Sequence, residues 1–171
     1  MNLYIIEGLD KTGKTTYTRH KFAGYKKMRL PGGFDYTQEM RKYFMEGSIP
    51  QAEMIHIIYG EHKAALQHLY ANNTECYVLD RSFISFFVYQ KELLMQYGFY
   101  DAYKKLLEDM FLKLSQKYEI KILYFSKRLV HRKDDWLEYI DADMLKDHFD
   151  ELLGQDFYKP FVEVVQVEIK K

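Results

Sequence analysis

The chain has 171 residues, with 25 basic and 25 acidic residues and hence no formal net charge, and its single cysteine is Cys76. This length suits one ordinary domain with a hydrophobic core of its own. The balanced charge argues against a general nucleic-acid binder, whose domains usually carry a basic excess. A single cysteine excludes an internal disulfide and suits a reducing compartment, and no apolar stretch approaches the roughly 20 residues of a membrane span. We therefore expect a cytoplasmic protein, with Cys76 in its core.

The N-terminal segment carries the most informative motif. Residues 8–15, GLDKTGKT, match the phosphate-binding pattern GxxxxGK[ST]. An apolar run at 3–6 predicts a strand before the motif, and residues 15–22 predict a helix after it. In that order, backbone N–H groups and the helix N-terminus can bind phosphate. The alternative is a glycine-rich turn that only joins a strand to a helix.

The motif predicts an ATP site. Its expected members are Gly8, Leu9, Asp10, Lys11, Thr12, Gly13, Lys14, Thr15 and Thr16. Lys14 is expected to reach the β and γ phosphates, and the hydroxyl of Thr15 to bind Mg²⁺.

The rest of the chain alternates between strands and helices. Further strands are predicted at 26–30, 75–79, 120–125 and 161–169, and further helices at 38–44, 50–71, 82–97, 101–118 and 137–153. Pro50 suits the first turn of its helix, and Ser82 and Asp101 are the expected N-caps of theirs. The buried stripe of the helix at 50–71 is expected to contain Met54, Ile58, Ala65 and Leu69.

This alternation predicts an α/β fold. We expect one domain, 1–171, with the three-layer P-loop NTPase architecture: a mostly parallel sheet of about five strands flanked by helices. Ligands of such sheets bind beyond the carboxyl ends of the strands. The glycine-rich motif, Asp80 and the segment from Ser126 all follow predicted strands, so we expect them to share one site.

Four segments resemble the thymidylate kinase family. They are EGLDKTGKTT at 7–16, RLPGG at 29–33, IIYGEHKA at 57–64 and DRSFISFFVYQ at 80–90, and they occur in the family's order over about the first 90 residues. The resemblance implies phosphoryl transfer from ATP, with Mg²⁺, to dTMP.

The resemblance also implies roles for charged residues beside the nucleotide. Asp80 would hold Mg²⁺ with Thr15, and Arg81 would bridge the phosphates of donor and acceptor. Asp10 would face the acceptor sugar or the metal, and Lys11 would assist transfer. Alternatively, Asp80 caps a helix or lies in a turn, Arg81 forms a surface salt bridge, and the other two are solvent-facing loop charges.

The acceptor site implied by the resemblance begins with two arginines and a helix face. Arg29 and Arg41 would lie near the acceptor, Tyr59 would stack on the base, and Lys63 would take the place of an arginine that meets a base carbonyl. Tyr59 and Lys63 share a helix face at i,i+4. Alternatively, Arg41 lies on a solvated helix face, Tyr59 belongs to the core, and Lys63 faces solvent.

A second helix face, at 85–90, would complete this site. Ser85 and Tyr89 are again spaced i,i+4, Gln90 can both donate to and accept from a pyrimidine edge, and Tyr89 would crowd a sugar 2′-hydroxyl or else lie in the core. Phe86 and Leu30 depart from the family, which carries a small polar and an acidic residue there.

A basic segment at 127–137 resembles the family's lid over the ATP phosphates. Arg128 is a candidate ATP contact and Arg132 a candidate catalytic cation, and the sequence leaves open which of them meets phosphate. A solvated loop and an RNA-contacting patch are the alternatives.

The predicted activity is ATP + dTMP → ADP + dTDP. The expected partners are small nucleotides, with no nucleic acid and no membrane, and a homodimer is implied by the family. A nucleoside kinase acting on thymidine is the nearest alternative, with Glu7 as the carboxylate to consider as its base. A non-catalytic nucleotide-binding module and a nucleic-acid-dependent NTPase are the others. The histidines show no metal-ligand grouping.

Overall fold

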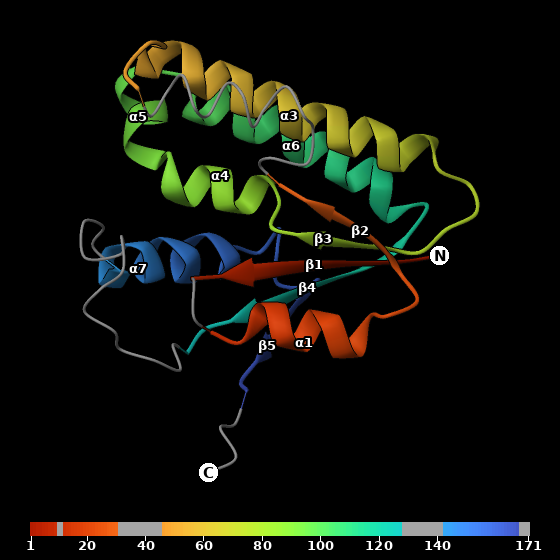
Figure 1. Ribbon diagram of the computed structural model, residues 1–171. Coiled ribbons are helices and arrows are strands. Elements are labelled where there is room, and N and C mark those ends of the chain that lie inside the picture. Colours follow the sequence, from red (N-terminus) through yellow and green to blue (C-terminus); the bar gives the residue numbers. More distant parts are fainter. Residues whose placement is uncertain (10–11, 31–45, 128–141, 168–171) are drawn as a thin grey trace.

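The computed structural model describes residues 1–9, 12–30, 46–127 and 142–167. Within them, five strands form one parallel sheet in the order β2-β3-β1-β4-β5 (Figure 1). The strands are β1 (Asn2–Gly8), β2 (Lys26–Arg29), β3 (Tyr77–Asp80), β4 (Glu119–Phe125) and β5 (Val162–Val165). The predicted α/β fold with a five-stranded parallel sheet is confirmed.

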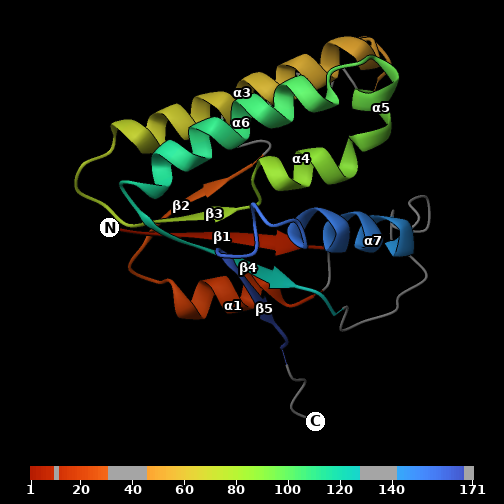
Figure 2. The same ribbon diagram turned by 180° about the vertical axis from the view of Figure 1, so that it is seen from behind.

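Helices cover both faces of this sheet. They are α1 (Lys14–Lys21), α3 (Gln51–Ala71), α4 (Phe83–Tyr89), α5 (Lys91–Gln96), α6 (Tyr100–Ser115) and α7 (Ala142–Leu153). Figures 1 and 2 show α3, α4 and α6 on one side of the sheet and α1 on the other. None of the described helices is long and apolar enough to cross a membrane. The helix predicted at 38–44 and nearly all of the lid segment lie outside the described residues.

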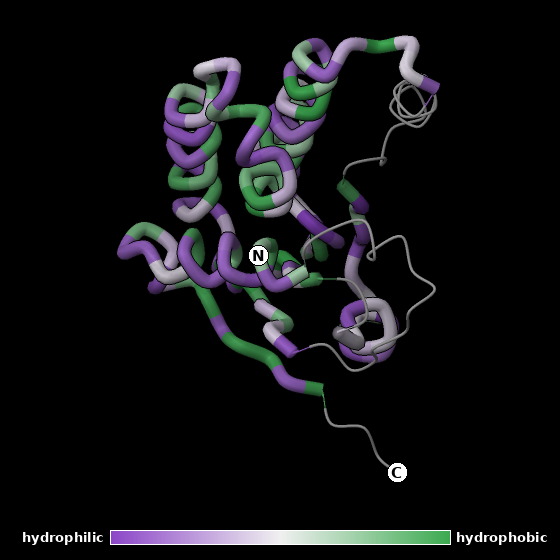
Figure 3. The backbone as a smooth tube through the Cα atoms, turned by 90° about the vertical axis from the view of Figure 1, so that its left-hand side faces the viewer, coloured by the Kyte–Doolittle hydropathy of each residue, from purple (hydrophilic) through white to green (hydrophobic). Residues whose placement is uncertain are grey.

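The alternation of side chains along β1 explains the two layers of helices. Leu3 and Ile5 point into a large cluster with α3, α4, α6 and α7, whereas Ile6 joins a smaller cluster with Phe22 and Phe125 beside α1. Figure 3 shows hydrophobic and hydrophilic residues alternating along the helices, as expected for amphipathic helices. The predicted stripe of α3 is confirmed, since Met54, Ile58, Ala65 and Leu69 are all buried.

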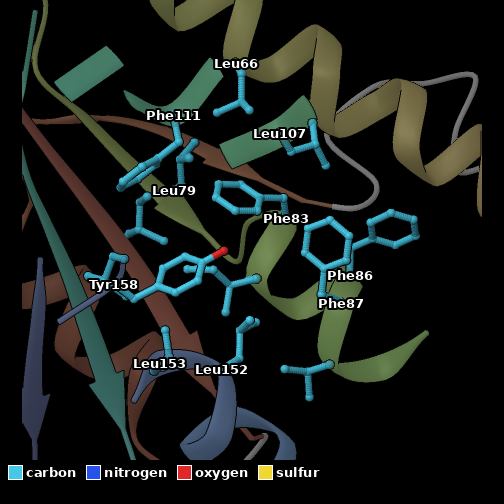
Figure 4. Packing of buried hydrophobic residues seen from close by; sticks show 14 of the residues in the cluster. Leu66, Leu79, Phe83, Phe86, Phe87, Leu107, Phe111, Leu152, Leu153 and Tyr158 are labelled. Carbon is cyan, nitrogen blue, oxygen red and sulfur yellow. The ribbon is translucent and has the colours of Figure 1, made fainter. Parts of the chain in front are cut away.

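Aromatic rings fill the space between the sheet and its helical cover (Figure 4). Phe83 meets Phe87 and Phe111 in edge-to-face geometry, with ring centroids 6.1 and 5.8 Å apart. Such pairs add about 0.5–1.5 kcal/mol to the free energy gained by burying their area. This packing fixes α4 above the carboxyl end of β3.

Three local predictions need correction. The helix predicted at 82–97 is two helices, because the backbone leaves helical geometry at Gln90 and the chain turns to bury Leu94 completely. The cap of α6 is Phe99, and Asp101 lies in its first turn instead. Cys76, predicted in the core, is only half-buried and lies just before β3. The predicted Ser82 cap is confirmed by a 3.2 Å hydrogen bond from the Ile84 N–H to its hydroxyl.

Gly8 is required by both space and conformation. Its φ is +137°, and a Cβ there would lie 2.4 Å from the carbonyl oxygen of Phe125. That oxygen belongs to the backbone of β4, which is paired with β1, so it cannot move aside as the end of a flexible side chain could. We expect Gly8→Ala to lower the free energy of unfolding by about 2 kcal/mol or more. Urea unfolding measures this loss.

Gly24→Ala is the matched control, because nothing lies within 4 Å of a Cβ there. It should unfold at nearly the wild-type urea concentration. Equal midpoints for Gly8→Ala and Gly24→Ala would contradict the close approach of β1 and β4.

Candidate functional site

The strand register places the polar strand ends side by side. Asp80 at the end of β3 pairs with Arg29 of β2 and with Ile6 of β1, and Gly8 pairs with Phe125 at the end of β4. The strand order changes direction at β1, and ligands of open α/β sheets bind at such points. The glycine-rich loop leaves the sheet at this place.

A cavity of about 320 Å³ opens where these strand ends meet. It is lined by Gly13, Lys14, Thr15, Thr16, Arg29, Asp80 and Arg81. The structure thus brings together residues that the sequence assigned to ATP, metal and acceptor. Three cations and one carboxylate surround the cavity, so it favours a multiply charged anion and leaves an oxygen ligand for a cation.

The start of α1 has the geometry of a phosphate loop. Gly13 caps the helix with φ 88°, in the left-handed region that glycine adopts without strain. The ammonium of buried Lys14 donates to the carbonyl oxygens of Gly8 (3.0 Å) and Leu9, and lies 3.4 Å from the hydroxyl of Thr12. The side chain of Lys14 is thereby directed to the centre of the loop.

Arg81 is held in an unusual backbone conformation at the edge of the cavity. Its φ of 69° makes it the one non-glycine residue with positive φ in the described part of the chain. Such a conformation costs on the order of 1 kcal/mol and commonly marks a functional position. Its N–H donates to the Ile6 carbonyl (3.0 Å), and its guanidinium donates to Ser85 Oγ (3.1 Å) and lies 5.2 Å from the ring centre of Tyr89.

Glu7 lies beneath this edge and is completely buried. Its Oε1 accepts from the N–H and hydroxyl of Ser82, both at 2.7 Å, and its Oε2 accepts from the hydroxyl of Ser85 at 2.5 Å. Burial raises the pKa of Glu7, while the charge of Arg81 and the hydrogen bonds from Ser85 and Ser82 act in the opposite direction. Glu7 is not among the residues that line the cavity, so it is poorly placed to act as a base there.

Comparison with solved structures places this arrangement among known folds. Thymidylate kinase from Ehrlichia chaffeensis matches with a TM-score of 0.60 and 14% identity, over 99% of this chain and 90% of that one. Deoxyadenosine kinase from M. mycoides with bound dATP matches at 0.59 and 17%, over 98% and 92%. NadR in complex with NR matches at 0.55 and 16%, over 95% of this chain but 43% of its own. This chain has the fold of the P-loop kinases.

The sequence itself matches no known family model. It also matches none of the curated proteins with which it was compared. The relationship to the P-loop kinases is therefore one of fold.

The residues predicted to bind the acceptor base lie outside this cavity. The ring of Tyr59 stacks on Tyr103 of α6, with centroids 3.8 Å apart and planes 5° apart. Lys63 is exposed on α3, the helix that carries Tyr59. One face of Tyr59 is therefore covered by protein. Gln90 is half-buried at the break between α4 and α5.

Five predicted site residues lie outside the described residues: Asp10, Lys11, Arg41, Arg128 and Arg132. Their assigned roles stay predictions. The described residues contain no group of three or more histidine, cysteine or carboxylate side chains that could hold a metal ion. Thr15 and Asp80 both line the cavity, so a hydroxyl and a carboxylate are available there for Mg²⁺ with a phosphate.

His62 is a buried polar side chain that is absent from the sequence-based predictions. It is 1% exposed and stacks on Phe86 with centroids 5.5 Å apart, and neither ring nitrogen has a hydrogen-bond partner among the described residues. Burial lowers the pKa of His62 to about 3. The helical period could have found it, because His62 lies four residues after Ile58 and three before Ala65 on the buried stripe of α3, whereas His56 and His68 are exposed.

This burial makes the stability of the protein depend on pH. Below pH 6.5 the unfolded chain takes up a proton at His62 that the folded protein does not bind, down to about pH 3. Stability should therefore fall in this window as the pH falls, by up to about 1.4 kcal/mol per pH unit from this group. Urea unfolding from pH 6.5 to pH 4 should show this slope in wild type and its loss in His62→Leu.

His20→Leu is the control, because His20 is exposed on α1. Its stability should follow the pH curve of wild type. Parallel curves for wild type and His62→Leu would show that His62 takes up its proton in the folded protein as well.

Proposed function

We propose that the protein is a nucleoside-monophosphate kinase that transfers the γ-phosphoryl group of ATP to a deoxypyrimidine monophosphate, with dTMP as the preferred acceptor. The observation that carries this proposal is the cavity beside the P-loop, where Lys14, Arg29 and Arg81 surround one space together with Asp80. A neutral nucleoside acceptor adds no charge to that of the ATP phosphates. A monophosphate acceptor places a second phosphate beside them, and the three cations can neutralise the charge of both nucleotides.

The reaction needs alignment and charge neutralisation. A phosphate oxygen of the acceptor forms a bond to the γ-phosphorus as the bond from that phosphorus to the β–γ bridging oxygen breaks, and ADP leaves. No hydroxyl proton has to be removed, so no protein base is required. Lys14 would stabilise the charge on the transferred group, and the fork of Arg81 would contact phosphates on both sides.

Mg²⁺ would be held by the hydroxyl of Thr15 and, directly or through water, by Asp80. When bound, it would neutralise part of the charge of the ATP phosphates. Among the residues outside the described part of the chain, Asp10, Lys11, Arg128 and Arg132 are the proposed further contacts.

The proposed deoxypyrimidine preference rests on Gln90, at the break between α4 and α5, and on Lys63 of α3, both of which lie outside the cavity. Gln90 can both donate to and accept from a pyrimidine edge, and Lys63 can only donate. Cytosine would turn an amino group toward the ammonium of Lys63 and leave both unpaired, at a cost of about 1–3 kcal/mol. Tyr89 would crowd a 2′-hydroxyl.

A deoxynucleoside kinase is the second candidate, and its support is the likeness in fold to deoxyadenosine kinase. That reaction needs a carboxylate that accepts the proton of a sugar hydroxyl. Glu7 is fully buried and hydrogen-bonded to Ser82 and Ser85, and Leu30 at the end of β2 is apolar and buried. Asp80 would be the carboxylate left for this role at the cavity.

Product analysis with ATP and Mg²⁺ separates the two candidates. The protein is incubated with each deoxynucleoside monophosphate, with UMP and with each deoxynucleoside, and products are resolved by chromatography. We expect diphosphates from dTMP and dUMP first, with dCMP, dGMP and UMP behind and nucleosides unused. Thymidine turning over while dTMP does not would overturn the proposal. If dGMP or dCMP is best, the base assignment fails and the monophosphate kinase stands.

Lys14→Ala should abolish this transfer, with turnover reduced on the order of 100-fold or more, because the charge on the transferred group loses its main protein cation. Thermal unfolding should show a folded variant. Lys21→Ala is the matched control, since Lys21 is exposed at the other end of the same helix. Wild-type turnover in folded Lys14→Ala would place Lys14 outside the reaction.

A further inference from the structure

The starting observation is a continuous hydrogen-bonded connection between a buried carboxylate and the arginine of the cavity. The hydroxyl of Ser85 donates to Glu7 Oε2 at 2.5 Å and accepts from the Arg81 guanidinium at 3.1 Å. It thereby links a carboxylate that is completely buried with an arginine that lines the cavity.

Each part of this connection is fixed by its surroundings. Ser85 is buried on α4, one turn after Ser82, and Glu7 also accepts from the backbone N–H and the hydroxyl of Ser82. The ring of Tyr89, one further turn along α4, lies against the Arg81 guanidinium at 5.2 Å. A long arginine side chain loses rotamer entropy when it is held in one place, and these contacts restrict it before any ligand binds.

Burying a carboxylate at a purely structural position costs more free energy than burying a neutral group. A buried carboxylate must be compensated by hydrogen bonds and a nearby charge, and a neutral group of the same shape commonly fits such a place as well. Burial has the largest influence on Glu7 and raises its pKa, while the charge of Arg81 and the hydrogen bonds from Ser85 and Ser82 act in the opposite direction. The hydrogen-bonded path from Glu7 through Ser85 to Arg81 gives this carboxylate a role beyond packing.

We propose that Glu7 is a positioning residue, which acts through the Ser85 hydroxyl to aim the Arg81 guanidinium at the phosphate cavity. This inference rests on the proposed function for its kinetic consequence, because the group to be aligned is the arginine that bridges donor and acceptor. Ser85, which the sequence suggested as a substrate contact, would then align Arg81 instead.

The test compares four variants with wild type, using the best acceptor of the product panel. Glu7→Gln keeps the shape, and with its amide oxygen on Ser82 it turns toward Ser85 Oγ an NH2 group, which donates and cannot accept the Ser85 proton. Ser85→Ala cuts the same connection from the other side. We expect each to lower kcat about 10-fold or more while KM for ATP changes less than 3-fold. The double variant should lose no more than either single one, because both remove one connection.

Ser82→Ala is the matched control. It removes the hydroxyl hydrogen bond to Glu7 and the N-cap of α4, but it keeps the backbone N–H of Ser82 on Glu7 and the path from Glu7 through Ser85 to Arg81. We expect its melting temperature to fall by several degrees while kcat stays within 2-fold of wild type. Glu7→Gln should show the reverse pattern, a low kcat with a melting temperature near that of wild type.

Crystal structures of wild type and Glu7→Gln supply a readout that needs no acceptor. The distance from the Arg81 guanidinium to Ser85 Oγ should lengthen or the side chain should change rotamer in the variant. An unchanged Arg81 with wild-type kcat, or a kcat loss in Ser82→Ala equal to that in Glu7→Gln, would overturn the positioning role. If wild type phosphorylates no acceptor, the proposed function fails, and the position of Arg81 in the two structures still decides this inference.

Discussion

The carboxylate of Glu7 joins the two segments of the chain that build the phosphate cavity. A charged group in a fully buried place needs hydrogen-bond donors, and the donors around Glu7 come from Ser82 and Ser85, about 75 residues later. Satisfying Glu7 therefore fixes the start of α4 against the end of β1. Asp80 and Arg81 directly precede α4, and the P-loop directly follows β1. Both sides of the cavity are positioned by this one buried interaction.

The sheet supplies the second constraint. Parallel pairing brings the ends of β1 and β4 level and places the end of β3 beside Ile6, and Gly8 allows the backbone of β4 to approach β1 closely. Arg81 then leaves β3 in a left-handed conformation that turns the chain into α4. A rigid frame of this kind suits phosphoryl transfer, where catalysis depends on alignment and charge more than on proton transfer.

Features set by local sequence could be predicted from the sequence. The strand before the glycine-rich motif, the helix after it, the helix at 51–71 and the Ser82 cap depend on residues close together in the chain, and the structure confirms them. The strand order, the break at Gln90 and the positive φ of Arg81 depend on what packs against them. The stack of Tyr59 on Tyr103 and the burial of Glu7 and His62 arise from contacts between distant segments. A periodic pattern marks such positions only as buried or polar, and the partner is decided by the tertiary fold.

A crystal structure of the protein with ADP, Mg²⁺, dTMP and aluminium fluoride would show whether Arg81 lies between donor and acceptor, since the fluoride complex occupies the place of the transferred group. We expect the ADP phosphates on the P-loop, the dTMP phosphate facing them across the cavity, and the Arg81 guanidinium within hydrogen-bond distance of both nucleotides. An acceptor phosphate bound away from Arg29 and Arg81, or an Arg81 that contacts neither nucleotide, would contradict it.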